Sequence, residues 1–317
     1  MKKSFFFTFA FCASLTVLLA VFCVNILRTN TSSCLIGAFL ADRPLKPDIA
    51  RFKSEFGRQP YLLMVFVDWG HYVDEEVIGD VYSSGSILFI TLEPWHAENK
   101  QGIDYDALLG GRWDDYLRRF AERLKNIGQP VFLRFAHEMN GNWYPWSGVK
   151  IGRDKYTAIY RYVKGIFDEE RAGNVRWVFS INAEDVPLEN NNFLLYYPGD
   201  RYVDYVGIDG YNWGDSRDWS RWMSFREIFE GRYSEITASL NKPVLISEFS
   251  SAGSGGDKAQ WIREAMSDIK LMRKIKAFVL FNMDKEEDWS FSGMAGGELK
   301  KQFTDQYFLS RPVFSNR

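Results

Sequence analysis

The feature that most constrains this chain is a repeated alternation of short apolar runs with longer stretches of helical periodicity. Several of the apolar runs lack a polar face, which is typical of parallel strands that helices cover on both sides. Eight runs have the length and composition of strands: Leu35–Leu40, Tyr61–Val67, Ile87–Leu92, Val131–Phe135, Val175–Ile181, Tyr202–Ile208, Val244–Ser247 and Ile275–Phe281. Four segments between them have apolar residues at helical spacing: Trp113–Ile127, Tyr156–Phe167, Phe225–Leu240 and Lys258–Met272. This alternation predicts an α/β fold, a (β/α)8 TIM barrel.

An open, doubly wound sheet is the alternative architecture. That fold leads us to expect a glycine-rich phosphate loop after an early strand, and the sequence contains none. A chain of 317 residues with 46% hydrophobic content has enough apolar side chains for one large core. No repeat or proline-rich linker divides it, so we expect a single barrel domain over residues 35–317.

The N-terminal residues 1–34 form a separate segment. Ser4–Leu27 contains no charged residue and would span about 36 Å as a helix, enough to cross a bilayer. The run is longer than the apolar region of a cleaved signal peptide and lacks a good cleavage site, so we favour an uncleaved signal-anchor over a cleaved signal. In both cases the domain is exported. It stays membrane-anchored outside the cytoplasm, or is secreted if the segment is cleaved.

Composition excludes some partners and leaves others open. The formal net charge is −2, so no basic field indicates nucleic acid. Cys34 is the one cysteine beyond the apolar run, which excludes a disulfide within the exported part. Aromatic residues make up 17% of the chain, with 11 tryptophans. Such rings either fill a core or stack on the apolar faces of sugars, and only the position of each ring distinguishes these two roles.

Polar and aromatic residues gather where the predicted strands end. In a TIM barrel the active site lies at these C-terminal ends. Any single polar residue there is more simply explained by contact with water, but their convergence favours a site. The candidates at successive strand ends are Trp69, Trp95, His96, His137, Asn182, Asp209, Tyr211, Trp213 and Trp289, together with the carboxylates Glu138 and Glu248.

Alternation of side chains along a strand predicts which residues point into the barrel. The predicted inward sets are Arg134, Ala136 and Glu138; Gly207, Asp209 and Tyr211; and Val244, Ile246 and Glu248. Two facing carboxylates permit glycosidase chemistry, in which one donates a proton to the leaving oxygen and the other attacks the anomeric carbon. A tyrosine and an arginine beside the attacking carboxylate would hold it anionic.

Metal and cofactor sites are not expected. Asp185 with Glu189 is the nearest approach to a ligand pair, but its spacing does not fit a metal site, and a solvated loop is the better interpretation.

The motif RFAHEMNGNW, from Arg134 to Trp143, resembles glycoside hydrolase family 26. That family contains β-mannanases and mixed-linkage β-glucanases within the large clan of barrel glycosidases, and it carries His-Glu where most of the clan carries Asn-Glu. The motifs DGYNW (Asp209–Trp213) and PVLISEF (Pro243–Phe249) follow in the family's order. The resemblance spans roughly residues 35–310.

The resemblance implies roles for individual residues. Glu138 matches the acid/base and Glu248 the nucleophile, with carboxyl groups about 5–5.5 Å apart in a retaining enzyme. His137 and Trp143 match residues that flank the sugar at the cleaved bond. Tyr211 matches the partner of the nucleophile, supported by Asp209. Trp95, His96 and Trp289 are similar to positions that frame the sugar on its non-reducing side.

Other residues near the motif have less defined roles. Arg134, Asn140 and Asn182 are predicted to support the site, and Trp69 and Trp213 to contact substrate. Trp146 fits two interpretations, a sugar platform or a hydrophobic plug under the loop.

The function predicted from these observations is a retaining endo-β-glycosidase that acts on β-mannan or β-1,3-1,4-glucan. A carbohydrate-binding barrel without hydrolysis is one alternative, although both glutamates are present. An accessory protein of an exopolysaccharide synthesis complex, held at the membrane by the N-terminal segment, is another.

Overall fold

The computed structural model describes residues 33–312 of the chain. The predicted signal-anchor therefore lies outside the described residues. Within the described part, none of the helices is long and apolar enough to cross a bilayer.

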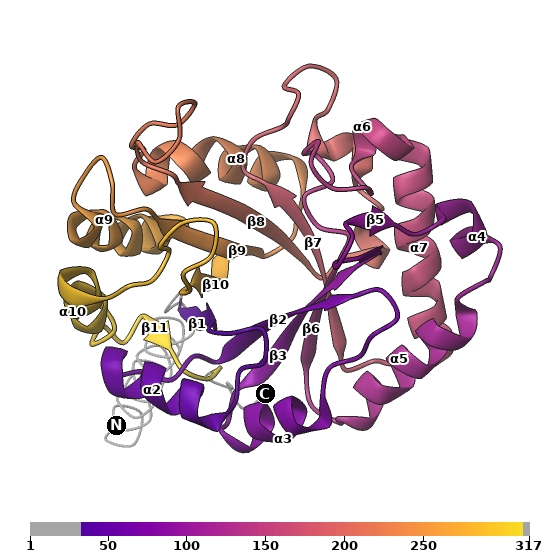
Figure 1. Cartoon of the computed structure of the whole chain (residues 1–317), viewed down its shortest axis with the longest axis horizontal. Coiled ribbons are helices and arrows are strands. Elements are labelled where there is room, and N and C mark those ends of the chain that lie inside the picture. The colour runs from indigo at the N-terminus through magenta and orange to yellow at the C-terminus, as the bar shows by residue number, and fades with distance from the viewer. Residues whose placement is uncertain (1–32, 313–317) are drawn as a thin grey trace, which may run out of the picture.

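Within residues 33–312, eight parallel strands close into a barrel, which confirms the predicted fold (Figure 1). The barrel strands are β1 (Cys34–Phe39), β2 (Leu62–Asp68), β3 (Ile87–Glu93), β6 (Val131–Phe135), β7 (Val175–Asn182), β8 (Tyr205–Asn212), β9 (Val244–Ser251) and β10 (Ile275–Phe281). They are neighbours in chain order, and β10 pairs with β1 to close the ring.

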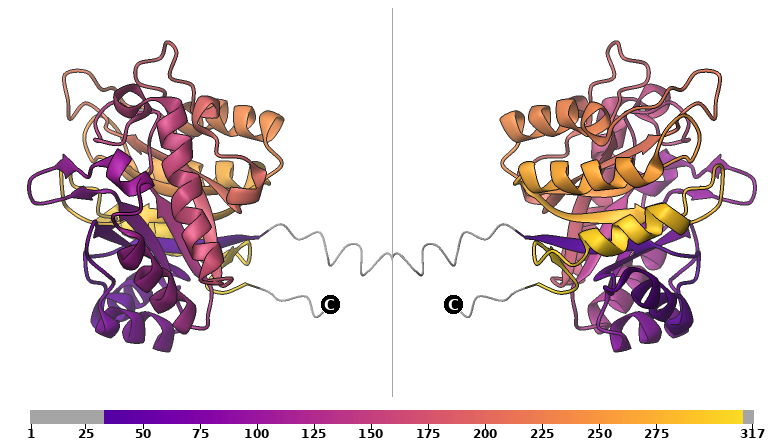
Figure 2. Two further views of the ribbon diagram at one scale, coloured as in Figure 1. Left: turned by 90° about the vertical axis from the view of Figure 1, so that its right-hand side faces the viewer. Right: turned by 90° about the vertical axis from the view of Figure 1, so that its left-hand side faces the viewer.

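Helices surround the strands (Figure 1). They are α2 (Lys46–Phe56), α3 (Glu75–Ser83), α4 (Tyr105–Leu109), α5 (Asp114–Asn126), α6 (Gly148–Ile151), α7 (Arg153–Glu169), α8 (Phe225–Ser239), α9 (Lys258–Leu271) and α10 (Gly293–Gln302), with 3-10 turns at Phe193–Tyr196 and Asp200–Tyr202. Outside the ring, β4 (Trp95–His96) pairs with β5 (Gln101–Gly102), and β11 (Phe308–Leu309) pairs in parallel with the start of β1. The two side views in Figure 2 show helices on the outside of the strands. The four predicted helices agree with α5, α7, α8 and α9 to within a few residues.

Two helices show why their sequences fold locally as they do. In α5 the buried residues Leu117, Phe120 and Leu124 form one stripe, with acidic residues in the first turn and basic ones in the last. α8 begins with a capping box, in which the Ser224 and Glu227 side chains each accept a hydrogen bond from the other's backbone N–H.

The start of β8 differs from the prediction. We predicted a strand from Tyr202, but the strand begins at Tyr205. Residues before it form a 3-10 turn, and the Asp204 carboxylate accepts a hydrogen bond from the Trp177 backbone N–H at 2.8 Å. The chain joins the sheet only after this side-chain contact.

The core has two layers. One lies between the strands and the helices. The other fills the barrel interior, with side chains that include Leu62, Met64, Phe89, Phe132, Val178, Leu245 and Val279. Burial of each such side chain stabilises the fold by about 1.5–3 kcal/mol. The interior is therefore packed, and polar groups gather above it at the carboxyl ends of the strands.

Candidate active site

Arg134 is the charged centre of the barrel mouth. It projects from β6 and is fully buried. Its Nη1 lies 2.8 and 2.9 Å from the two carboxylate oxygens of Asp209, and its Nη2 donates to Oε1 of Glu248. Its Nε donates to the Thr91 hydroxyl at 2.8 Å. A buried cation requires such partners, because an unpaired charge in this environment is very unfavourable.

Glu248 reaches the mouth because of a β-bulge. Leu245 points into the barrel interior, whereas Val244 and Ile246 pack in the layer under the helices. The register then shifts, since Ile208 pairs with Ile246 and the next residue, Asp209, pairs with Glu248. The predicted common inward face of Val244, Ile246 and Glu248 is therefore wrong. One extra residue on β9 turns the glutamate inward.

Tyr211 completes the surroundings of Glu248. Its hydroxyl donates to Oε2, while Arg134 binds Oε1. Burial and the charge of Glu248 raise the pKa of Tyr211 well above its ordinary value, so the phenol keeps its proton and acts as donor. Both oxygens of this carboxylate therefore have a donor that stabilises the anion.

Glu138 sits on a different kind of backbone. β6 ends at Phe135, and both Ala136 and Glu138 have positive φ, +48° and +53°. These left-handed conformations are unfavourable for residues with a Cβ and are typical of functional sites. The prediction that strand alternation carries through Ala136 to Glu138 is wrong for this reason. Instead, the Glu138 N–H donates to Ser180 O on β7 at 2.9 Å.

The Glu138 carboxyl is held by two neutral donors. Nε1 of Trp143 lies 2.8 Å from Oε2, and Nδ2 of Asn182 lies 2.9 Å from Oε1. Burial, together with the negative charges of Asp209 and Glu248, raises the pKa of Glu138 to about 8. At neutral pH this group is mainly a protonated acid, ready to donate a proton.

His137 and the rings that follow it support this loop. Nε2 of His137 lies 3.1 Å from the Tyr144 hydroxyl. Burial and the nearby positive charge of Arg134 lower the pKa of His137 well below its ordinary value, so the ring is neutral. Trp146 is completely buried, stacks on Tyr144 at 4.3 Å and donates to His137 O at 2.7 Å. Of the two interpretations of Trp146, the structure supports the plug under the loop.

Asn140 links the loop that carries Glu138 to helix α8. Its Oδ1 accepts from Asn182 N at 2.9 Å, and its Nδ2 donates to Asp185 Oδ1 at 2.8 Å. Asp185 in turn pairs with Arg232 of α8 at 2.8 Å and is buried. Our interpretation of Asp185 as part of a solvated loop is therefore wrong. It is a buried ion-pair partner in a network that reaches Glu138 through Asn182.

The predicted aromatic residues divide into cleft and core positions. Trp143 is 42% exposed beside Glu138. Trp95 is half-buried and donates to Glu93, and Trp213 is half-buried beside Tyr211. His96 is exposed on β4, outside the barrel ring.

Two predicted substrate contacts are buried instead. Trp69 is 1% exposed and packs against Trp113 and Tyr116, so the structure places it in the core and not at the mouth. Trp289 is also 1% exposed and lies against Tyr211 and Trp213. Trp69 belongs to the layer between the strands and the helices, whereas Trp289 belongs to the interior layer and lies against the partner of Glu248.

Glu93 and Lys285 lie near the site, and our sequence analysis did not select them. Glu93 ends β3, and burial raises its pKa to about 7 although Trp95 donates to it. The Lys285 ammonium lies 5.5 Å from the Phe66 ring and 5.8 Å from the Phe281 ring. The position of Glu93 after a strand was a usable signal. Lys285 comes from a long loop with no pattern that indicates its direction.

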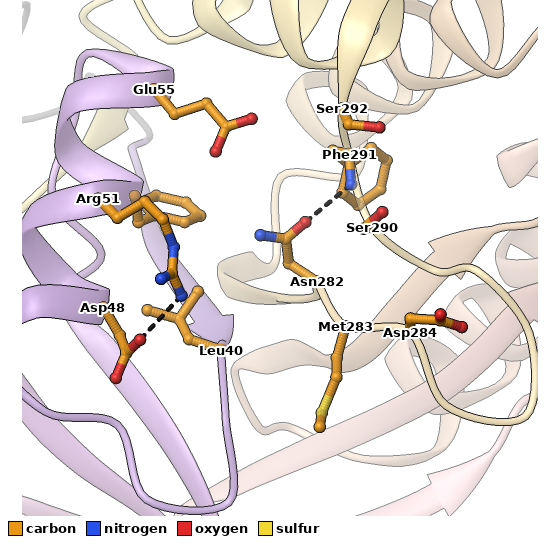
Figure 3. Close-up of a pocket in the computed structure, with 11 residues that line it drawn as sticks. Leu40, Asp48, Arg51, Glu55, Asn282, Met283, Asp284, Ser290, Phe291 and Ser292 are labelled. Carbon is orange, nitrogen blue, oxygen red and sulfur yellow. Dashed lines mark hydrogen bonds and ion pairs between the residues drawn. The ribbon is translucent and has the colours of Figure 1, made fainter.

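A pocket of about 340 Å³ lies beside the loop that follows β10 (Figure 3). The α2 side supplies Asp48 and Arg51, which form an ion pair of 2.8 Å, and the other side includes Asn282, whose Oδ1 accepts from Phe291 N. The pocket holds no facing pair of buried carboxylates, so the barrel mouth remains the candidate for catalysis.

Comparisons with known proteins agree with this geometry. Residues 96–311 match the family described as glycosyl hydrolase family 26. Endoglucanase H of Acetivibrio thermocellus is 38% identical over 288 residues, which cover 87% of this chain and 31% of that protein. A mannan endo-1,4-beta-mannosidase of Bacillus subtilis is 30% identical over 164 residues, which cover 47% of this chain and 39% of that protein. The chain spans about a third of the length of these two relatives.

Solved structures share the fold. A Bacillus subtilis mannanase superposes with a TM-score of 0.63 and 22% identity, covering 87% of this chain and 86% of that one. A β-mannanase from a symbiotic protist of the termite Reticulitermes speratus superposes with a TM-score of 0.62 and 17% identity, covering 89% and 90%. At these identities the likeness concerns the barrel alone. The family match, which extends over more than half of the chain and includes both glutamates, goes further: this chain belongs to glycosyl hydrolase family 26.

Proposed function

We propose that this chain is a retaining endo-β-glycosidase. One observation carries the proposal: two buried glutamates share the barrel mouth, and their surroundings favour opposite charge states. Glu248 accepts hydrogen bonds from Arg134 and Tyr211, whereas Glu138 is buried between neutral donors with a pKa of about 8. Paired carboxyl groups of this kind separate the roles of nucleophile and acid.

The proposed reaction is a double displacement. Glu248 attacks the anomeric carbon while the Glu138 proton passes to the glycosidic oxygen, so the leaving chain departs as an alcohol and a covalent glycosyl-enzyme forms. A water molecule then attacks the same carbon, Glu138 takes its proton, and the Glu248 carboxylate is released. Arg134 and Tyr211 stabilise the carboxylate before attack and after release.

Among β-linked polysaccharides, β-glucan is the substrate that we propose to test first. The similarity to Endoglucanase H covers 87% of this chain at 38% identity, whereas that to the Bacillus mannosidase covers 47% at 30%. β-Mannan is the second candidate. Both relatives are glycoside hydrolases by name, which favours hydrolysis over a barrel that only binds carbohydrate.

The test is a reducing-end assay of the purified protein on soluble β-1,3-1,4-glucan, β-mannan and xylan, with Glu248→Ala as the control. We expect new reducing ends on β-glucan or β-mannan and a rapid fall in viscosity from internal cleavage. NMR spectra in the first minutes should show the β-anomer of the new reducing end. An initial α-anomer would indicate inversion and would contradict the proposed nucleophilic role of Glu248.

We also propose that the catalytic domain is exported and remains attached to the membrane through residues 1–34. The charge-free run Ser4–Leu27 supports this proposal. Mass analysis of the membrane-extracted protein should find the run intact. A mature N-terminus near residues 24–36 would instead indicate secretion after cleavage.

A place in an exopolysaccharide synthesis complex is a further proposal, and co-purification with a membrane synthase would test it.

A further inference from the structure

Trp219 is an exposed ring on the loop between β8 and α8. It exposes 71% of its surface, compared with 42% for Trp143 beside the acid. Single exposed apolar residues are common on protein surfaces, so exposure alone decides nothing. The surroundings of this ring are the informative feature.

A continuous series of aromatic contacts joins Trp219 to the nucleophile. The Trp219 ring lies edge-on against Trp213, with centroids 5.5 Å apart. Trp213 lies 4.7 Å from Trp289, which lies 4.8 Å from Tyr211. Tyr211 donates its hydroxyl proton to the carboxylate of Glu248. Trp219 therefore stands at the outer end of an aromatic wall that begins at the catalytic centre.

The loop that carries Trp219 is closed at its base. Oδ1 of Asn212 accepts from Gly214 N at 3.2 Å and from Met223 N at 2.9 Å, so one amide side chain holds both ends. Asn212 is itself completely buried and donates to Ser251 Oγ at 2.9 Å. The exposed ring therefore lies on a loop whose two ends are held together by hydrogen bonds.

Arg217 connects this loop to the loop that follows β10. The Arg217 guanidinium lies 5.2 Å from the Trp213 ring centroid. Its Nη1 lies 3.2 Å from Glu287 Oε2, and its Nη2 donates to Glu286 O at 2.6 Å. The two loops form one rim, and a ring fixed in advance loses little conformational entropy when a ligand stacks on it.

We propose that Trp219 forms a distal sugar subsite, at which a pyranose ring of a β-linked glycan stacks outside the catalytic centre. This inference rests on the proposed glycosidase function and adds that the enzyme binds several sugar units of a polysaccharide at once. A flat aromatic face suits the C–H faces of a pyranose.

The experiment compares Trp219→Ala with the wild type on two substrates of different length. One is soluble β-1,3-1,4-glucan or β-mannan, whichever the enzyme cleaves. The other is an aryl β-glycoside of a single sugar of the same kind, which fills only the sugar position at the cleaved bond. Leu271→Ala is the matched control, since Leu271 is 69% exposed at the C-terminal end of α9, away from the mouth. We expect Trp219→Ala to lower kcat/KM on the polymer by roughly 3- to 10-fold and to leave the aryl glycoside unchanged.

Trp219→Phe should lower kcat/KM on the polymer less than Trp219→Ala does, because a smaller ring still stacks on the sugar. Equal losses on both substrates, or no loss on the polymer, would overturn the subsite. Affinity electrophoresis in gels that contain either polysaccharide separates this inference from the proposed function, because it does not depend on cleavage. Retardation that Trp219→Ala abolishes supports the subsite even if no hydrolysis occurs. Wild-type protein that neither cleaves nor is retarded by either glycan overturns it.

Discussion

The two glutamates at the barrel mouth have opposite electrostatic surroundings. On the side of the proposed nucleophile, Arg134 and Tyr211 donate to Glu248 from β6 and β8, and Arg134 also pairs with Asp209. On the acid side, Glu138 lies on a left-handed turn and receives only neutral donors. The comparison shows that residue type does not set the role of a carboxyl group. Glu248 has a cationic and a phenolic donor, whereas burial and the charges of Asp209 and Glu248 raise the pKa of Glu138.

Removal of the nucleophile is expected to have the largest effect. Glu248→Ala should reduce kcat by at least about 10⁴-fold on polymers and on activated aryl glycosides alike, because no other group can form the covalent intermediate. Loss on both substrates is the signature to measure. Near wild-type cleavage by this variant would end the assignment and favour a carbohydrate-binding role.

Removal of the acid should separate the two sides of the mouth. Glu138→Ala should lower activity on polysaccharide by roughly 10²- to 10⁴-fold, since the sugar leaving group needs a proton. Aryl glycosides with good leaving groups should still form the glycosyl-enzyme. Azide should then accelerate its breakdown and yield a glycosyl azide of retained configuration, measured by NMR. Absence of azide rescue would show that Glu138 has another role.

Tyr211 tests how the nucleophile is stabilised. Tyr211→Phe removes the hydroxyl that donates to Glu248 and keeps the ring that packs against Trp289. We expect kcat to fall by roughly 10- to 1000-fold, which corresponds to about 1.4–4 kcal/mol of transition-state stabilisation. The melting temperature should change little. Unaltered kcat and kcat/KM on a soluble β-glycan would mean that Arg134 alone fixes the carboxylate.

The sequence predicted the barrel because eight apolar runs alternate with helices, and it placed both glutamates at strand ends. The route by which they reach the mouth was not predictable from period-two alternation. A bulge on β9 reverses the facing of Glu248, and positive φ at Ala136 and Glu138 redirects the acid loop. Gly207, Asp209 and Tyr211, on the regular strand β8, follow the alternation as predicted. Pattern reasoning therefore works where the strand is regular and fails where the backbone is built for the site.

Trp69 shows a second limit of the sequence pattern. A tryptophan after a strand either faces the cleft or packs beneath it, and the sequence pattern is the same in both cases. Trp69 is 1% exposed, whereas Trp143 and Trp219 are 42% and 71% exposed, and no strand-end rule selects Trp219. Contacts between loops, such as those of Arg217 with Glu286 and Glu287, have no period that the sequence would reveal.

The smallest expected effect concerns the pKa of the acid. Asn182 donates to Glu138 Oε1, and this hydrogen bond lowers the pKa of Glu138, opposing the increase to about 8 that burial and nearby charges cause. Asn182→Ala should therefore raise that pKa further, and the basic limb of kcat/KM should move to higher pH by less than about one unit. Asn142→Ala, a change of an exposed asparagine in the same loop as Glu138, is the control and should leave the limb in place. The comparison requires pH profiles measured on an aryl glycoside of moderate leaving-group ability, for which proton donation still limits the rate. A limb that moves to lower pH in Asn182→Ala would mean that the amide oxygen accepts a hydrogen bond from the protonated acid, and Asn182 would then act together with burial and the nearby charges to keep Glu138 protonated.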